Sequence, residues 1–153
     1  EFDHPLIGRQ ALSLDIEAET FRRELAGART FGFMKDVAKL WSAGYALGAS
    51  FDNTLVVSED RVLNPGGLRF ADEFVRHKIL DAVGDLALAG QPLLGAYRTV
   101  RGGHKLNHAV LSALMADRSA WRVVEAIEPA RRARGYAQVG AGRLAVAYGP
   151  EKS

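Results

Sequence analysis

The sequence predicts an α+β protein built as a two-layer sandwich of a mixed β-sheet and helices. Short segments with alternating or β-branched apolar residues indicate strands, and longer segments with apolar residues at helical spacing lie between them. Clusters of glycine, proline and asparagine separate the two kinds. With 153 residues, 48% of them hydrophobic and 25% charged, the chain can form one domain with a sizeable core.

The first two elements follow from the spacing of apolar residues. Residues 11–16 place three aliphatic side chains on alternate positions, which predicts a strand. Residues 18–26 place Phe21 and Leu25 four positions apart, which predicts a helix that buries both.

The next segment combines a helix and a hairpin. Residues 34–43 predict a helix that stops near Gly44. Its expected inward side chains are Val37, Leu40 and Trp41. Residues 54–57 and 61–63 predict a hairpin, and the cluster at 64–67, Asn-Pro-Gly-Gly, predicts a turn.

The second half holds two principal helices. Residues 72–89 and 104–116 have apolar residues at helical spacing, and residues 94–100 predict a strand between the helices. Residues 120–126 predict a further helix, and residues 143–148 contain a short apolar stretch that can pair as a strand.

A polar row marks the longer helix. His77 and Asp81 are four residues apart, so they share a helix face and can direct an imidazole and a carboxylate at one zinc ion. Asp85 continues this row one turn later. The alternative is that these residues form an exposed polar stripe. One contact between side chains four residues apart would then stabilise the helix by roughly a few tenths of a kcal/mol.

A second polar motif opens the last principal helix. His104 follows two glycines, which allow the backbone to approach another group closely. His108, four residues later, is interpreted as a surface histidine, and His4, beside Pro5, as structural.

Together these motifs resemble a known family. The run Arg-His-Lys-Ile-Leu-Asp-Ala-Val-Gly-Asp-Leu and the later Gly-His-Lys-Leu-Asn-His are similar to UDP-3-O-acyl-N-acetylglucosamine deacetylase, the zinc amidohydrolase that catalyses the committed step of lipid A synthesis in bacteria. Matches of the same kind lie, in order, at residues 28–34, 48–53 and 61–70.

The resemblance implies a domain organisation. Residues 1–127 resemble the second of the family's two domains, with residues 30 to about 57 as a β-α-β insert. A first domain, absent here, would carry a third zinc-ligating histidine and a general-base glutamate. Residues 128–153 form a basic tail rich in Gly and Ala, expected to be solvated; contact with anionic lipid or nucleic acid is the alternative.

It also implies roles for individual residues. His77 and Asp81 would be zinc ligands. His104 would stabilise the oxyanion and protonate the leaving amine, with Asp85 as its partner carboxylate, and Thr30 would lie near the tetrahedral intermediate. The expected substrate-binding residues are Lys78 for the sugar nucleotide and Phe31, Phe33, Met34, Phe51 and Val56 for the acyl chain. The alternatives are a surface lysine and ordinary core packing.

The predicted function is zinc-dependent hydrolysis of the N-acetyl group of UDP-3-O-acyl-N-acetylglucosamine in lipopolysaccharide biosynthesis of a Gram-negative bacterium. This chain would supply half of the active site and be inactive alone. The alternative is a non-catalytic fragment or acyl-chain-binding module. A cytoplasmic location is expected, because the sequence has no cysteine and no apolar run of membrane-spanning length. A net charge of +2 gives no argument for nucleic acid.

Overall fold

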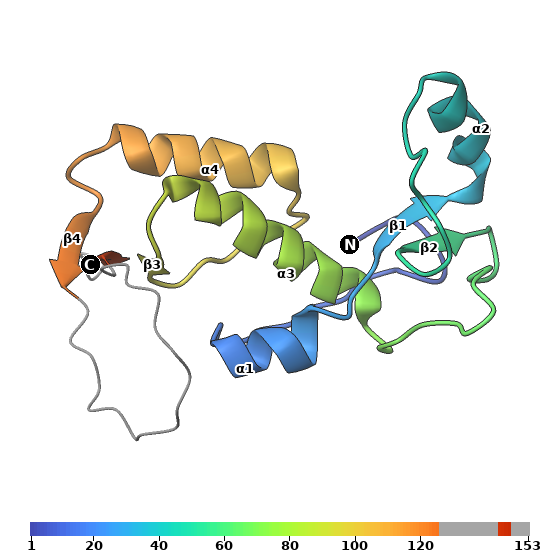
Figure 1. Ribbon diagram of the computed structural model, residues 1–153, viewed down its shortest axis with the longest axis horizontal. Coiled ribbons are helices and arrows are strands. Elements are labelled where there is room, and N and C mark those ends of the chain that lie inside the picture. Colours follow the sequence, from blue (N-terminus) through green and yellow to red (C-terminus); the bar gives the residue numbers. More distant parts are fainter. Residues whose placement is uncertain (126–143, 148–153) are drawn as a thin grey trace. The chain divides into compact units, whose positions relative to one another are not determined.

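A computed structural model describes residues 1–125 and 144–147. The chain divides into two compact units, residues 1–81 and 82–153, and the boundary falls inside one helix, α3 (Glu73–Leu86). Helices and short strands occur in both units, which confirms the α+β class (Figure 1). No helix in the described ranges is both long and apolar enough to cross a membrane.

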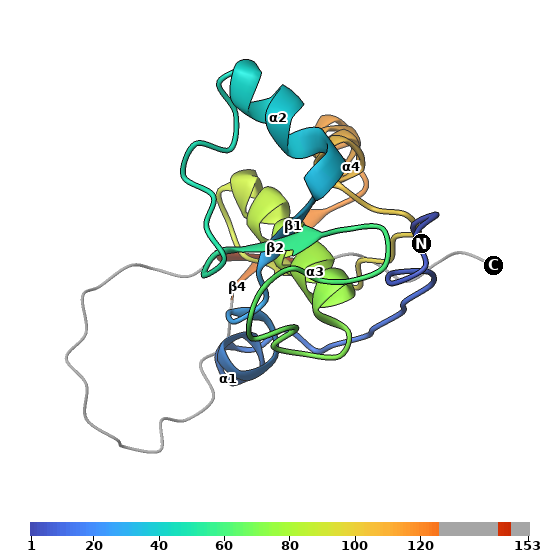
Figure 2. The same cartoon turned by 90° about the vertical axis from the view of Figure 1, so that its right-hand side faces the viewer.

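The first unit contains the predicted β-α-β insert. Strand β1 (Thr30–Phe33) leads into helix α2 (Met34–Ser42), and a long connection returns to β2 (Thr54–Val57) (Figures 1 and 2). The strands pair in parallel, which the crossover through a helix allows. Their register pairs Thr30 with Thr54, Phe31 with Leu55, Gly32 with Val56 and Phe33 with Val57.

One face of these two strands forms the core of the first unit. Leu55 and Val57 are almost fully buried and pack with Ile7 and Phe74. Each such side chain contributes about 1.5–3 kcal/mol through burial. Around this cluster pack Phe2, Phe31, Phe33, Val62 and Leu68.

The predicted hairpin and turn are present in short form. Residues after β2 fold back through a single antiparallel bridge between Val57 and Val62. The turn at 64–67 is confirmed, because the Gly67 N–H donates to the Asn64 carbonyl at 2.9 Å. Gly67 has a φ of +63°, which glycine adopts at little cost.

Two expectations for the first unit are wrong. Residues 11–16 form no strand, although Leu12 and Leu14 are half-buried in alternation, because no neighbouring strand in the described part of the chain pairs with them. Helix α2 has the predicted bounds to within one residue, but Trp41 is 59% exposed and Leu40 36% exposed. Residues 18–26 are helical as predicted, with α1 (Ala18–Thr20) continuing as the π-helix η1 (Phe21–Leu25). Leu25 is fully buried as expected, whereas Phe21 is only half-buried.

The second unit holds the end of α3, the 3-10 turn η2 (Ala87–Ala89), and helix α4 (His104–Ala116), which has the predicted bounds. Its three-stranded sheet has the order β3 (Leu93–Leu94), β5 (Leu144–Ala147) and β4 (Arg122–Glu125). β5 pairs with β3 in parallel and with β4 in antiparallel fashion, so the sheet is mixed, and the strand expected within residues 143–148 is confirmed.

Two predictions for this unit are wrong. The strand expected at residues 94–100 pairs only at Leu93–Leu94, and Val100 is 72% exposed. The helix expected at 120–126 is the strand β4, because Val123 and Val124 are β-branched and find a partner in β5. The remainder of the predicted basic tail, including Arg131, Arg132 and Arg134, lies outside the described residues.

Candidate functional site

The predicted zinc ligands lie together on one face of α3, on its second and third turns. Nδ1 of His77 is 3.4 Å from Oδ2 of Asp81, one helical turn further along. The side chains are 14% and 13% exposed, so both are largely shielded from solvent. The spacing therefore produces the convergence that the sequence predicts.

The donor chemistry of this pair suits zinc. A neutral imidazole nitrogen and a carboxylate oxygen are both common zinc ligands. Catalytic zinc sites use three protein ligands and keep one position open. The part of the chain that the structure describes contains no group of three or more His, Cys, Asp or Glu side chains placed to hold a metal ion. His77 and Asp81 thus fit two positions of such a site.

A buried ion pair between Arg29 and Glu73 holds the backbone near Thr30 and His77 in place. Glu73, fully buried one turn before His77, accepts hydrogen bonds from the backbone N–H of Arg29 at 3.0 Å and from its Nε at 2.9 Å. The other carboxylate oxygen accepts from the Arg69 N–H at 2.6 Å. Because Thr30 directly follows Arg29, this pair ties the start of β1 to the start of α3 within the first unit.

The same arginine also orders the segments that flank β2. Its Nη1 donates to the Phe51 carbonyl at 3.2 Å and its Nη2 to the Gly67 carbonyl at 2.8 Å. Asn64, only 4% exposed, binds the carbonyls of Phe51 and Thr54 through Nδ2. The backbone around the insert is therefore held by two buried polar side chains, and each of them forms hydrogen bonds with backbone carbonyls.

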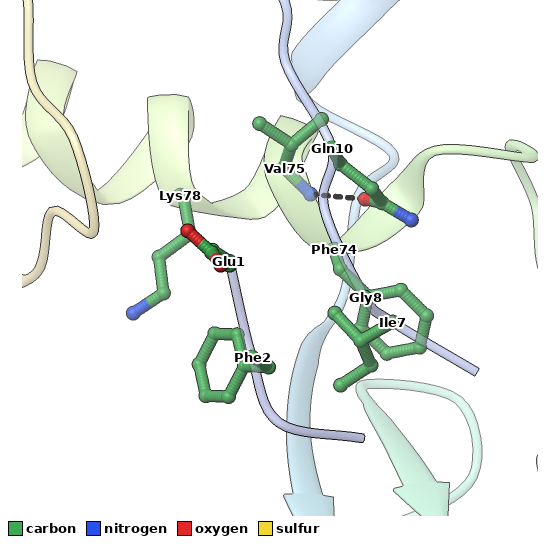
Figure 3. Close-up of a pocket in the computed structure, with 8 residues that line it drawn as sticks. All are labelled: Glu1, Phe2, Ile7, Gly8, Gln10, Phe74, Val75 and Lys78. Atoms are coloured by element: carbon green, nitrogen blue, oxygen red, sulfur yellow. Dashed lines mark hydrogen bonds between the residues drawn. The ribbon is translucent and has the colours of Figure 1, made fainter. Parts of the chain in front are cut away.

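Lys78 is one of the residues that line a small pocket in the first unit. The pocket is lined by Glu1, Phe2, Ile7, Gly8, Gln10, Phe74, Val75 and Lys78 (Figure 3). Nζ of Lys78 is 6.0 Å from the ring centre of Phe2 and 5.8 Å from that of Phe31. Two other residues of the pocket lining are joined by a hydrogen bond, in which the Val75 N–H donates to the Gln10 side chain at 3.1 Å (Figure 3). Aromatic faces thus favour the ammonium at this position.

The residues expected along an acyl passage lie on two different faces. Alternate residues of a strand point to opposite sides, so Phe31 and Phe33 face the core with Leu55 and Val57. The ring centres of Phe31 and Phe74 are 5.1 Å apart. Val56 points to the opposite side of the strands.

That outer face is open. Gly32 is the register partner of Val56, and a Cβ placed on Gly32 meets no atom within 4 Å. Thr30 lies two residues before Gly32, so its exposed side chain belongs to the same face. Met34, the first residue of α2, is 51% exposed, and Phe51, shortly before β2, is 49% exposed.

In the second unit Asp85 and His104 form the predicted pair. Nδ1 of His104 is 2.8 Å from Oδ2 of Asp85. The Asp85 side chain is 13% exposed and that of His104 is 67% exposed, so the carboxylate is sheltered while the imidazole is accessible. His104 occupies the first position of α4 after Gly103.

Two further residues complete this cluster. Nδ2 of Asn107 donates to the same Asp85 oxygen at 2.9 Å, and the Tyr97 hydroxyl donates to Oδ1 of Asn107 at 2.7 Å. Asn107 is 1% exposed. The hydrogen bond from Asn107 lowers the pKa of Asp85; burial opposes this effect, and the hydrogen bond from His104 and the charges of His104 and His108 add to it.

Sequence patterns alone do not single out Asn107 or Tyr97, since an asparagine and a tyrosine are common at surfaces. The available signal is spacing, because Asn107 follows His104 by three positions and so shares its helix face. Tyr97 lies in an irregular segment, where no periodicity points to its partner. His108 is exposed, in agreement with its interpretation as a surface residue. His4 contacts the Phe33 ring, at 5.2 Å between ring centres, and its Nδ1 accepts from the Leu6 N–H at 3.3 Å.

Comparison with known proteins agrees with these motifs. The family model described as UDP-3-O-acyl N-acetylglycosamine deacetylase matches residues 1–116. Proteins named UDP-3-O-acyl-N-acetylglucosamine deacetylase from Brucella ovis, Brucella canis and Brucella melitensis are each 59% identical to this chain over 127 residues. The match covers 82% of this chain and 44% of each relative.

The chain therefore spans less than half the length of these relatives, and the range that the family model matches, residues 1–116, contains His77, Asp81, Asp85 and His104. Because the model covers most of the chain and the identity is high, the chain belongs to the UDP-3-O-acyl N-acetylglycosamine deacetylase family.

Proposed function

We propose that this chain provides one half of the active site of a zinc-dependent deacetylase. The substrate would be UDP-3-O-acyl-N-acetylglucosamine, the products acetate and the free amine, and the pathway lipid A biosynthesis. The observation that carries the proposal is the pair of Asp85 and His104 at 2.8 Å, in a chain that belongs to a deacetylase family.

Two ligands of the metal come from this chain. His77 and Asp81 supply an imidazole nitrogen and a carboxylate oxygen from one face of α3. When bound, zinc supplies a Lewis acid and a nucleophilic water at neutral pH. The third ligand and the general base would come from the part of the family's proteins that this chain does not cover.

His104 is the proton donor of the reaction. Hydrolysis forms a C–O bond between water and the acetyl carbon and breaks the C–N bond, so the amine nitrogen must gain a proton as it leaves. With Nδ1 directed to Asp85, Nε2 of His104 is the atom that meets the substrate and donates this proton. The Thr30 hydroxyl donates a hydrogen bond to the oxyanion.

Lys78 and the insert bind the rest of the substrate. The Lys78 ammonium pairs with the negative diphosphate of the nucleotide. The acyl chain follows the outer face of β1 and β2 and passes Gly32 and Val56. Met34, directly after β1, and Phe51, shortly before β2, border this face. Phe31 and Phe33 support this face from the core side.

One observation favours the alternative for the isolated chain. No group of three metal-ligating side chains occurs within residues 1–125 and 144–147. The chain alone would then act as an acyl-chain-binding module without hydrolysis.

Zinc binding tests the assignment of ligands. The chain alone is expected to bind zinc weakly, because two protein ligands stand where catalytic zinc has three. A chimeric protein, in which this chain replaces the matching part of the Brucella ovis relative, should bind it tightly. Titration against a competing chelator measures both affinities.

In that titration Asp81→Ala and His77→Ala should each weaken binding, whereas the controls Asp117→Ala and His108→Ala should not. Asp117 and His108 are exposed and lie on or beside α4. Undiminished zinc affinity in Asp81→Ala would remove Asp81 from the ligand set.

The length of the acyl chain tests the outer face. Each CH₂ buried there should contribute about 0.8 kcal/mol, or about fourfold in Kd, until the face is covered. NMR titration of this chain with substrates of increasing acyl length measures the trend.

Gly32→Val should abolish this trend by filling the outer face. Gly48→Val is the matched control, because a Cβ at either glycine meets no atom within 4 Å and neither has a positive φ. A Kd that ignores chain length in the native chain, or a trend that survives in Gly32→Val, contradicts the passage.

A further inference from the structure

We propose that Asn107, held in place by Tyr97, is a positioning residue that keeps the proton on Nδ1 of His104 by fixing the Asp85 carboxylate. This inference deepens the proposed function and rests on it, since it concerns the same acid. Tyr97, Asn107, Asp85 and His104 form one continuous chain of hydrogen bonds within the second unit.

The orientation of the Asn107 amide follows from its partners. An ionised carboxylate only accepts hydrogen bonds, so the amide must turn its Nδ2 toward Asp85, where the distance is 2.9 Å. Its Oδ1 then faces Tyr97, which must donate its hydroxyl proton at 2.7 Å. Each group therefore has one role, and the reversed amide would place two acceptors against each other.

The same reasoning settles the tautomer of His104. Oδ2 of Asp85 receives both Asn107 and Nδ1 of His104, so Nδ1 must carry a proton in the neutral ring as well as in the cation. Nε2 is then the ring nitrogen that the proposed reaction uses, on a side chain that is 67% exposed. Asn107 serves this arrangement from a fully enclosed position, since it is 1% exposed.

Three residues of α4 act on Asp85. Asn107 and His104 form hydrogen bonds to it, and His108 acts through its charge. The Asn107 bond is the largest cause of the lowered pKa of Asp85. Removing this bond should therefore move the titration midpoint of Asp85 upward and loosen the carboxylate.

The test compares three variants of the chain by NMR. Asn107→Ala removes the amide, Tyr97→Phe removes only the hydroxyl that orients it, and Leu111→Ala is the control. Leu111 is 7% exposed and lies one turn beyond Asn107 on α4. Its truncation therefore lowers stability but removes none of the hydrogen bonds that link Tyr97, Asn107, Asp85 and His104. Long-range ¹H–¹⁵N spectra give the tautomer of His104, and ¹³C spectra give the titration of Asp85.

The native chain and Leu111→Ala should show the proton on Nδ1 and a low Asp85 midpoint. Asn107→Ala should shift the proton toward Nε2 and raise the midpoint, and Tyr97→Phe should do both to a smaller extent. If Asn107→Ala does not fold, Tyr97→Phe decides the question. A native chain with the proton on Nε2, or variants with an unchanged tautomer and midpoint, would overturn the proposal.

Kinetics in the chimeric protein separate this inference from the proposed function. Asn107→Ala should lower kcat by about 10–100-fold, as loss of a supporting hydrogen-bond partner does, with KM unchanged. An unchanged kcat would overturn the positioning role. If the chimeric protein without any substitution is inactive, this result would instead count against the proposed function. The NMR comparison would still decide what Asn107 does.

Discussion

Replacing His104 by alanine in the chimeric protein is expected to lower kcat by about 10²–10⁴, the usual contribution of a positioned acid or base. The zinc content should stay the same, because His104 pairs with Asp85 and is assigned no ligand role. Steady-state kinetics and metal analysis of the same preparation measure both quantities.

Two variants sharpen this prediction. His108→Ala, one turn further along α4 and exposed, should retain activity. Asp85→Asn should lose less activity than His104→Ala, because it removes only the carboxylate that orients the imidazole and leaves the imidazole itself in place. Loss of zinc from His104→Ala would make that residue a ligand, and the division of roles proposed here would be wrong.

Truncating Glu73 is expected to have the largest effect on stability. Glu73→Ala leaves the guanidinium of Arg29 buried without its partner, and removal of one member of a buried ion pair costs about 3–5 kcal/mol. Urea unfolding of the chain measures this loss. Glu19→Ala is the control, since its contact with Arg22 joins side chains that are both 72% exposed and should contribute little. Equal unfolding midpoints for the two variants would contradict the role of the pair.

The same pair predicts how stability depends on pH. Burial raises the pKa of Glu73. Hydrogen bonds from the Arg29 side chain and from the N–H groups of Arg29 and Arg69 together lower the pKa by more than burial raises it, so the pKa lies below its ordinary value of 4.5. A carboxyl group with a lowered pKa stabilises the folded state above its ordinary pKa. That contribution should disappear as the pH falls through the lower value of the folded chain, and Glu73→Gln should lack this part of the acid transition.

Local signals were sufficient where an element is defined by its own residues. Helix α4 begins where Gly103 ends the irregular segment, and the His104–Ala116 bounds follow from continuous apolar spacing. The turn at 64–67 needs only its own asparagine and glycines. The insert was implied by family resemblance, and its parallel register confirms that expectation.

Elements that depend on distant partners could not be predicted in this way. An alternating pattern at residues 11–16 describes a strand only if a neighbouring strand supplies hydrogen bonds, and none in the described residues does. Glu73 is an acidic residue in a first helical turn, which usually indicates exposure, yet Arg29, 44 residues earlier, allows its full burial.

For the candidate site, spacing along one helix placed His77 beside Asp81, because residues four apart share a face. The pairing of Asp85 with His104 came from family resemblance, because 19 residues separate them. Asn107 and Tyr97 show the limit of pattern analysis, since their roles depend on the three-dimensional contact with Asp85.

The exposed connection between α2 and β2 gives this chain a convenient attachment point for a reporter group. Leu47 is 77% exposed in that connection, and no core side chain comes from residues 43–49. Because the sequence contains no cysteine, Leu47→Cys introduces a single thiol that a fluorophore can modify selectively. A dye there would sit on the insert itself, so acyl-ligand binding could be followed by fluorescence without altering Thr30, Gly32 or Val56.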